Sequence, residues 1–294
     1  MSKLLPSAPS ELVVRAVSSS VGSSGAESEF DFSDADFEKV RALIHRHAGI
    51  SLNAGKQAMV YSRLSRRLRE TSHRSFASYL KALSAALPSD TEWQQFINCL
   101  TTNLTAFFRE EHHFNELRAD LLRGGNRKPR IWCSAASTGE EPYSIAMVLA
   151  ENLGHHSGAR IIATDIDTQV LVKARRGVYE AQARGLSAER LQRHFLRGRG
   201  TNQGAIRVKP ELASMVDYRP CNLMDSDWSL GEAFDIIFCR NVMIYFDAAT
   251  QRGVLERMHR VLKPGGLLYV GHSENFTDSR DIFRLRGKTI YERV

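Results

Sequence analysis

The turn at Ser137–Glu141 carries two carboxylates where a nucleotide-binding protein usually carries glycine. It lies inside IWCSAASTGEEPYSIAMVLAENLG (131–154), which reads as a buried strand, a tight turn and an amphipathic helix. A pyrophosphate needs close backbone approach and free N–H groups, but this turn holds only Gly139, followed by Glu140 and Glu141. A like-charge pair at about 4 Å costs about 1 kcal/mol in water and about 4 kcal/mol at an effective dielectric of 20. The turn therefore favours a phosphate-free, positively charged ligand such as S-adenosylmethionine, unless the acids only complement the helix dipole.

Another acid follows the next apolar run. In RIIATDID (160–167), Asp165 stands at the end of a predicted strand, where a carboxylate can accept hydrogen bonds from both hydroxyls of a ribose. Dehydrogenases share this feature, so it points to a ribose rather than to one cofactor. Asp167 is a competing candidate, which we expect instead to cap the following helix.

Two further stretches bring polar residues to the same edge of the predicted sheet. FDIIFCRN places Arg240 and Asn241 at the carboxyl end of a strand, where open α/β sheets bind ligands. RPCNLMD places Asn222 and Leu223 after another short strand. An asparagine and a backbone amide there can read the edge of an adenine, with Leu223 against its face. For Asn222, ordinary turn chemistry is the alternative.

The elements that must position these residues alternate from Arg130 onward. The apolar runs RIWCSA, RIIATDID, FDIIFCRN, GGLLYVGHS and KTIYERV are separated by helical segments. This rhythm predicts an α/β domain over residues 131–294, with a parallel sheet covered by helices on both faces. Residues 177–215 interrupt the rhythm and read as a small inserted β-subdomain with a glycine-rich hairpin.

The first part of the chain has a different character. Residues 33–120 show helical periodicity, with Ser33 as the first cap, and predict an all-α domain. Residues 121–130 read as a linker. Residues 1–32 are rich in Ser, Gly and Ala without periodicity, and we expect a flexible extension.

Composition narrows the class of protein. The chain has 294 residues and a net charge of +7, which favours an acidic partner such as nucleic acid, an anionic membrane face or an acidic protein. It has neither a run long enough to span a membrane nor a signal-peptide pattern, so we expect a cytoplasmic protein. Its histidine pairs lack metal-ligand spacing, and we expect no metal site. Four cysteines without a C-x-x-C pair indicate reduced thiols: Cys99, Cys133, Cys221 and Cys239.

Five stretches in order resemble the chemoreceptor glutamate methyltransferase family of bacterial chemotaxis: TTNLTAFFREEHHF (101–114), CSAASTGEEPYSIA, ATDID, CRNVMIYF and LKPGGLLYVGHSE. The resemblance extends from Ser33 to Val294. It implies a Rossmann-like class I methyltransferase fold that uses S-adenosylmethionine and releases S-adenosylhomocysteine. It also implies that glutamate side chains in the cytoplasmic domains of chemoreceptors are converted to γ-glutamyl methyl esters.

The same resemblance implies a set of residues that contact the cofactor or border the active site. They are Asn103, Thr105, Arg109, Glu140, Asp165, Asn222, Leu223, Arg240 and Asn241.

These motifs contain neither a nucleophilic cysteine nor a His–Asp pair that could act as a general base. Methyl transfer to a carboxylate requires neither. A glutamate has an unperturbed pKa of about 4.3 and is already ionised near neutral pH. It needs desolvation and alignment for in-line displacement, but no general base. We expect Arg109 and Tyr245 to hold the acceptor carboxylate; the alternative is that both are structural.

A basic helix and a glycine-rich hairpin are candidates for substrate recognition. On a helix over Ala54–Glu70, one face is apolar and the adjoining stripe is basic, which suits an acidic receptor coiled coil, with RNA as the other acidic partner. The stripe consists of Lys56, Arg63, Arg66 and Arg67. The hairpin, with Gly198, Gly200 and Gly204, is similar to the loop by which some family members dock a receptor's C-terminal pentapeptide.

Two other functions compete with this interpretation. The net charge suits a nucleic-acid methyltransferase, but the Asn/Asp-Pro-Pro-Tyr motif of base amino-methylases is replaced by Asn241-Val-Met-Ile-Tyr. A non-catalytic cofactor-sensing or receptor-docking module is the other, and the intact polar cofactor positions argue against it. The sequence indicates neither the receptors and glutamates involved nor the oligomeric state.

Overall fold

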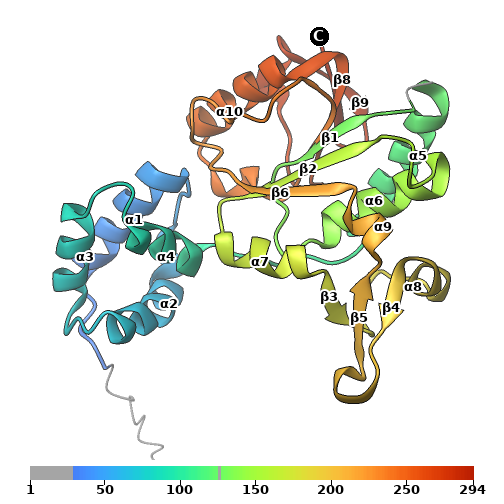
Figure 1. The fold of residues 1–294 in the computed structure, drawn as a ribbon. Coiled ribbons are helices and arrows are strands. Elements are labelled where there is room, and N and C mark those ends of the chain that lie inside the picture. Colours follow the sequence, from blue (N-terminus) through green and yellow to red (C-terminus); the bar gives the residue numbers. More distant parts are fainter. Residues whose placement is uncertain (1–28, 125–126) are drawn as a thin grey trace, which may run out of the picture.

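The computed structural model describes residues 29–124 and 127–294. Figure 1 shows a helical domain beside a larger sheet domain, from which a small lobe projects. The predicted flexible extension falls almost entirely on residues 1–28, outside the described part. Its last residues differ from the prediction, because Phe30 and Phe32 pack their rings against Phe76 and extend the core of the helical domain.

The helical domain consists of amphipathic helices closed by predictable caps. They are α1 (Asp34–Ala48), the 3-10 turn η1 (Ala54–Lys56), α2 (Gln57–Glu70), α3 (Phe76–Ala85) and α4 (Thr91–Leu100). Ser33 caps α1 by accepting a hydrogen bond from the Asp36 N–H, and Gly49 ends the helix in the left-handed conformation. Leu64 and Leu68 of α2 are fully buried, as we expected for the apolar face of this helix.

The large domain is an open α/β sheet in the order β6-β2-β1-β7-β8-β10-β9. Its strands are β1 (Arg130–Cys133), β2 (Arg160–Asp165), β6 (Val216–Pro220), β7 (Phe234–Cys239), β8 (Leu262–Val270), β9 (Phe283–Gly287) and β10 (Ile290–Arg293). β6, β2, β1, β7 and β8 are parallel, whereas β10 runs antiparallel to both neighbours. The near-continuous apolar runs reflect burial on both faces of the sheet. The predicted α/β fold is therefore confirmed.

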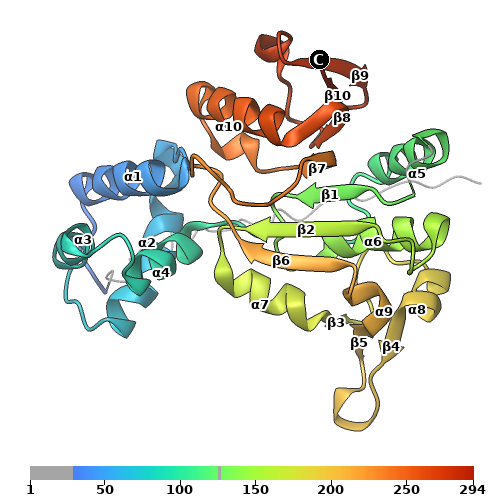
Figure 2. The same cartoon turned by 45° about the horizontal axis from the view of Figure 1, so that its top comes forward.

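Helices cover both faces of this sheet. They are α5 (His112–Gly124), α6 (Glu140–Leu153), α7 (Thr168–Arg176) and α10 (Ala248–Val261). Figure 2 shows α10 on one face and α6 and α7 on the other, with β1 and β2 pointing toward the helical domain. No helix in the described part of the chain is long and apolar enough to cross a membrane.

Helix α5 belongs to the sheet domain rather than to the helical domain that we expected to reach residue 120. Phe114, Leu117 and Leu121 are buried in the same core as α6. The expected linker over residues 121–130 therefore begins inside α5 and ends on β1. Periodicity reveals an amphipathic helix but does not say which apolar surface will cover it.

The inserted subdomain forms the projecting lobe, as predicted. Its antiparallel sheet has the order β3-β5-β4, from β3 (Val178–Glu180), β4 (Phe195–Arg197) and β5 (Ala205–Val208). Two short helices, α8 (Ala188–His194) and α9 (Pro210–Ala213), flank it. Phe195, Ile206 and Val208 anchor the lobe in the same hydrophobic core as α6.

Candidate active site

A cavity of about 360 Å³ opens at the carboxyl ends of β1, β2 and β7, facing the helical domain. β1 lies between β2 and β7, so this is the topological switch point of the sheet, where open α/β folds bind ligands. The helical domain supplies the opposite wall through residues 48–53. Ten predicted site residues line the cavity: Lys56, Asn103, Thr105, Arg109, Asp165, Asn222, Leu223, Arg240, Asn241 and Tyr245.

Asp165 ends β2 with its carboxylate at the cavity. One oxygen accepts a hydrogen bond from the Ser137 N–H at 2.8 Å and the other from the Asp167 N–H at 2.9 Å. Burial raises the pKa of Asp165 to about 6, although these backbone donors oppose the shift. Asp167 caps α7 as predicted, and also accepts a hydrogen bond from the Asn103 amide at 2.8 Å. Asp165 therefore faces the cavity, whereas Asp167 connects the end of β2 to Asn103 and to the first turn of α7.

The turn after β1 separates the two glutamates that the sequence placed together. Gly139 has φ of 101°, and a Cβ there would lie 2.6 Å from the Tyr179 hydroxyl, so only glycine fits. The Glu140 carboxylate accepts a hydrogen bond from Thr138 at 2.6 Å and lines a neighbouring depression instead of the cavity. Burial raises the pKa of Glu140. Glu141 is the acid that lines the cavity.

Arg240 is held inside the protein by acids. Its side chain is buried and forms ion pairs with Glu141 and with Glu110, at 3.2 Å from the latter. It also donates a hydrogen bond to the Arg109 carbonyl. The sequence predicted a contact with the cofactor; the structure adds that Arg240 neutralises Glu141 and fixes the backbone beside Arg109.

Glu110, which sequence reasoning missed, connects several cavity residues. It accepts hydrogen bonds from the Asn241 amide at 3.2 Å and from the His272 ring at 3.0 Å. Burial alone would raise the pKa of Glu110, but these donors and the charge of Arg240 lower it to about 2. Phe108 and Glu110 both have positive φ, as has Asn241, and such strain is typical of functional sites. Only the position of Glu110 beside Arg109 in the motif could have pointed to it.

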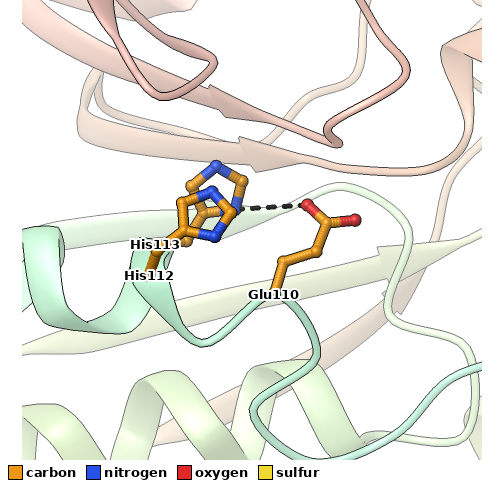
Figure 3. A group of neighbouring side chains, drawn as sticks. All are labelled: Glu110, His112 and His113. Atoms are coloured by element: carbon orange, nitrogen blue, oxygen red, sulfur yellow. Dashed lines mark ion pairs between the residues drawn. The ribbon is translucent and has the colours of Figure 1, made fainter.

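Glu110, His112 and His113 form the one group in the described ranges whose atoms are close enough to hold a metal ion (Figure 3). His113 is fully buried, and its Nε2 lies 2.9 Å from the Lys288 carbonyl. Burial and the nearby Arg240 charge lower the pKa of His113 to about 4. A guanidinium already occupies the cationic position beside Glu110, and these contacts argue against a metal ion there.

Asn222 joins the two domains. Its amide donates a hydrogen bond to the His47 carbonyl at 2.6 Å, and its oxygen accepts one from the Met224 N–H at 3.0 Å. The side chain expected to read an adenine edge is therefore engaged within the protein, although it still lines the cavity. Leu223 is buried at the cavity wall, as an adenine-packing residue would be.

Arg109 and Tyr245 lie at the cavity from different segments. Arg109 donates a hydrogen bond to the Leu104 carbonyl at 2.9 Å. Tyr245 belongs to a 3-10 turn, η3 (Met243–Tyr245), and its carbonyl accepts a hydrogen bond from the Ser51 N–H at 2.7 Å. The helical domain thereby holds the turn that carries Tyr245.

Two of the four members of the basic stripe are engaged within the helical domain, which we did not expect. Arg63 donates to the carbonyls of Leu100 and Thr101 at the end of α4, at 3.1 and 2.8 Å. Arg67 is ion-paired with Glu92 and its side chain is only 13% exposed. Both arginines hold α2 against α4, a role that a helical wheel of α2 alone cannot reveal.

Two members of the stripe remain near solvent or ligand. Arg66 is 76% exposed and pairs with Glu70 at 2.8 Å, while Lys56 lines the cavity. The hairpin glycines lie away from the cavity, around the 3-10 turn η2 (Gly200–Asn202) between β4 and β5. Gly200 and Gly204 have positive φ there, as a tight turn requires.

Comparison with known proteins decides the family. Residues 35–101 match the CheR methyltransferase all-alpha domain, and residues 103–291 match the CheR methyltransferase SAM-binding domain. The chain belongs to the CheR methyltransferase family. Its resemblance to this family, its fold and its use of S-adenosylmethionine are thereby confirmed.

Relatives in this family cover most of the chain. The chemotaxis protein methyltransferase of Escherichia coli is 52% identical over 261 residues, which are 88% of this chain and 91% of the relative. Chemotaxis protein methyltransferase 2 of Pseudomonas aeruginosa is 50% identical over 268 residues, 90% of this chain and 94% of the relative. Among solved structures, the DhpI–SAH complex matches with a TM-score of 0.33 at 14% identity, over 64% of this chain and 70% of that one, too distant to inform the site.

This CheR-family chain is therefore an S-adenosylmethionine-dependent methyltransferase of chemotaxis. The nucleic-acid methyltransferase suggested by the net charge is not favoured.

Proposed function

We propose that this CheR-family enzyme acts in the cytoplasm and methylates the γ-carboxylates of glutamates in the cytoplasmic domains of chemoreceptors. The products are γ-glutamyl methyl esters and S-adenosylhomocysteine. The observation that carries the proposal is the composition of the cavity. It joins a ribose-type acid, Asp165, to Arg109 and Tyr245, which can hold a carboxylate.

The lining residues suit this cofactor. Asp165 offers buried carboxylate oxygens to the ribose hydroxyls, and Leu223 offers an apolar surface to the adenine. Glu141 also lines the cavity, but its charge is balanced by Arg240, so Asp165 supplies the negative charge that favours an ammonium or sulfonium over a phosphate. Asn103 and Thr105 border the same space.

The acceptor needs orientation more than activation. When bound, S-adenosylmethionine supplies an electrophilic methyl group on a positively charged sulfur. The protein has to strip water from the acceptor carboxylate and direct one oxygen along the line of attack. Arg109 can neutralise the carboxylate while the Tyr245 hydroxyl aims it, and an ionised carboxylate leaves no proton to remove.

A labelling experiment tests this function. The protein is incubated with tritiated S-adenosylmethionine and either receptor cytoplasmic fragments or total RNA, and the label is then exposed to mild base. We expect base-labile label on the receptor and none on RNA. The matched control is the same fragment with its modified glutamates replaced by glutamine, which should take up no label. Label on RNA, or on neither substrate, would remove the proposal.

We further propose that the β4–β5 hairpin docks a receptor's C-terminal pentapeptide by strand addition. Tethering would raise the concentration of enzyme near its substrate helices. Deleting the receptor's last five residues should weaken binding in calorimetry at least tenfold. Unchanged affinity would reject the tether without affecting the methylation proposal.

A further inference from the structure

Three cations line a depression next to the cofactor cavity. Lys173 and Arg176 extend from α7, and Arg184 follows β3. Within residues 29–124 and 127–294, none of their side chains has a hydrogen-bond or ion-pair partner. The depression they line has a volume of about 550 Å³. Such clustered, unpaired positive charge is a place where a carboxylate of another molecule would gain ion pairs.

The positive charge of the chain is concentrated in the segment that contains these three cations. Residues 173–209 contain ten lysines and arginines and two glutamates, a net charge of +8. The complete chain carries +7, so the remaining sequence is almost neutral. The acidic partner implied by the net charge is therefore attracted to α7 and the inserted subdomain. The stripe of α2 is a weaker candidate, because Arg63 and Arg67 are already bonded within the protein.

The depression and the cofactor cavity share a wall. Thr105 lines both, with Asn103 and Leu104 on the cavity side and Ala106 and Phe107 on the other. An elongated substrate that presents a glutamate to the cavity can therefore reach the depression with neighbouring side chains. On a helix, residues three and four positions apart lie about 5–6 Å apart and would point to one side together.

The lining is also partly apolar. Val178 is 51% exposed, and the rings of Tyr179 and Phe107 pack edge to face with centroids 4.9 Å apart. Two acids lie there too, Glu140 and Glu180, but Glu140 is bonded to the Thr138 hydroxyl, and the cations outnumber the acids. Cations around a partly apolar lining suit an amphipathic helix that carries acidic residues beside apolar ones.

We infer that this depression is a substrate-recognition site, which binds acidic side chains next to the acceptor glutamate on the receptor helix. The inference rests on the proposed function and adds a specificity element outside the cofactor cavity. Lys173, Arg176 and Arg184 select acceptor glutamates that have further carboxylates within about one helical turn.

The test is a triple substitution, Lys173→Gln, Arg176→Gln and Arg184→Gln, measured with the tritium assay on receptor fragments. The matched control removes the same charge from exposed cations of the helical domain, by Lys39→Gln, Arg74→Gln and Lys81→Gln. We expect kcat/KM for the receptor to fall at least tenfold in the triple variant and less than twofold in the control. Calorimetry should give the same affinity for S-adenosylhomocysteine in all three proteins, and circular dichroism the same melting temperature.

Equal losses of kcat/KM in the triple variant and the control would overturn the inference, because they would reflect long-range attraction of the receptor by the net charge of the enzyme. A loss explained by weaker binding of S-adenosylhomocysteine would overturn it as well. If the unsubstituted enzyme does not label the receptor at all, the proposed function fails instead, so the two failures are distinguishable.

A charge exchange provides a second test. Arg184→Glu should reduce labelling, and fragments with single acid-to-lysine changes within two turns of the labelled glutamate should be assayed with it. Direct contact is supported if Arg184→Glu labels one such fragment at least fivefold more than it labels the unchanged fragment, while the unsubstituted enzyme shows no such gain. If no fragment recovers, Arg184 does not contact an acid of the substrate.

Discussion

Lowering the pH from 7 to 5 should weaken cofactor binding about tenfold through Asp165. Burial raises the pKa of this carboxyl to about 6. Only the ionised form can accept hydrogen bonds from both ribose hydroxyls. A group with this pKa is about 90% ionised at pH 7 and about 10% ionised at pH 5. The resulting tenfold loss of affinity corresponds to about 1.4 kcal/mol.

The sign follows from the direction of the shift. The folded protein holds the proton of Asp165 more tightly than the unfolded chain does, so ionisation costs stability above about pH 6 and nothing well below pH 4. A bound ribose offsets that cost by donating to the carboxylate. Cofactor binding therefore releases a proton near pH 6, and affinity rises with pH through this range.

The assay is calorimetric titration of S-adenosylhomocysteine at pH 5, 6 and 7. Asp165→Asn is the matched control: it should bind weakly at pH 7, with an affinity that changes less than twofold with pH. An unsubstituted protein with pH-independent affinity would refute the reasoning, and so would an equally steep pH dependence in Asp165→Asn.

Three further predictions concern the scaffold. Arg240→Gln should lower the free energy of unfolding in urea by about 3–5 kcal/mol, because it removes a buried guanidinium that is ion-paired with both Glu110 and Glu141. Arg219→Gln, whose side chain is 43% exposed, should change it by less than about 1 kcal/mol, and equal effects would contradict the role of the Arg240 ion pairs. Leu64→Ala should cost about 2–5 kcal/mol in the same measurement, since Leu64 is fully buried in the helical core, and a loss below 1 kcal/mol would mean that this core is loosely packed. Gly198→Ala should weaken pentapeptide binding without changing cofactor affinity, because its Cβ would lie 1.9 Å from the Asn202 carbonyl and force the hairpin to shift; unchanged peptide binding would show that the hairpin is not the docking site.

The sheet and its edge could be predicted because they leave local signals. Strands buried on both faces read as continuous apolar runs, and the polar residues that follow them must meet at one edge. Asp165, Asn241 and Leu223 accordingly line one cavity although they are far apart in the chain. The inserted subdomain could be found because it interrupts an otherwise regular rhythm.

What could not be predicted depends on which partner a side chain meets. Arg63 and Arg67 look like free surface cations on a helical wheel, but α4 presents its carbonyl end and Glu92 to them. Asn222 could read a base, yet the end of α1 takes its amide. Glu110 gives no signal of its own, since its importance arises from donors contributed by distant segments.

The cofactor cavity is walled by both domains, and this has a consequence for how long the enzyme survives in the cell. Residues 48–53 face the sheet edge across the ligand space, and the Ser51 N–H and the Asn222 amide add hydrogen bonds between the two walls. A ligand in that space bridges the domains, and at a hundredfold excess over its Kd it stabilises the folded state by about 2.7 kcal/mol. In a cell short of methyl donor, the two domains would be held together less firmly and proteases would cleave the enzyme sooner. Methylation would then fall because enzyme is lost, in addition to the fall caused by the shortage of methyl donor itself.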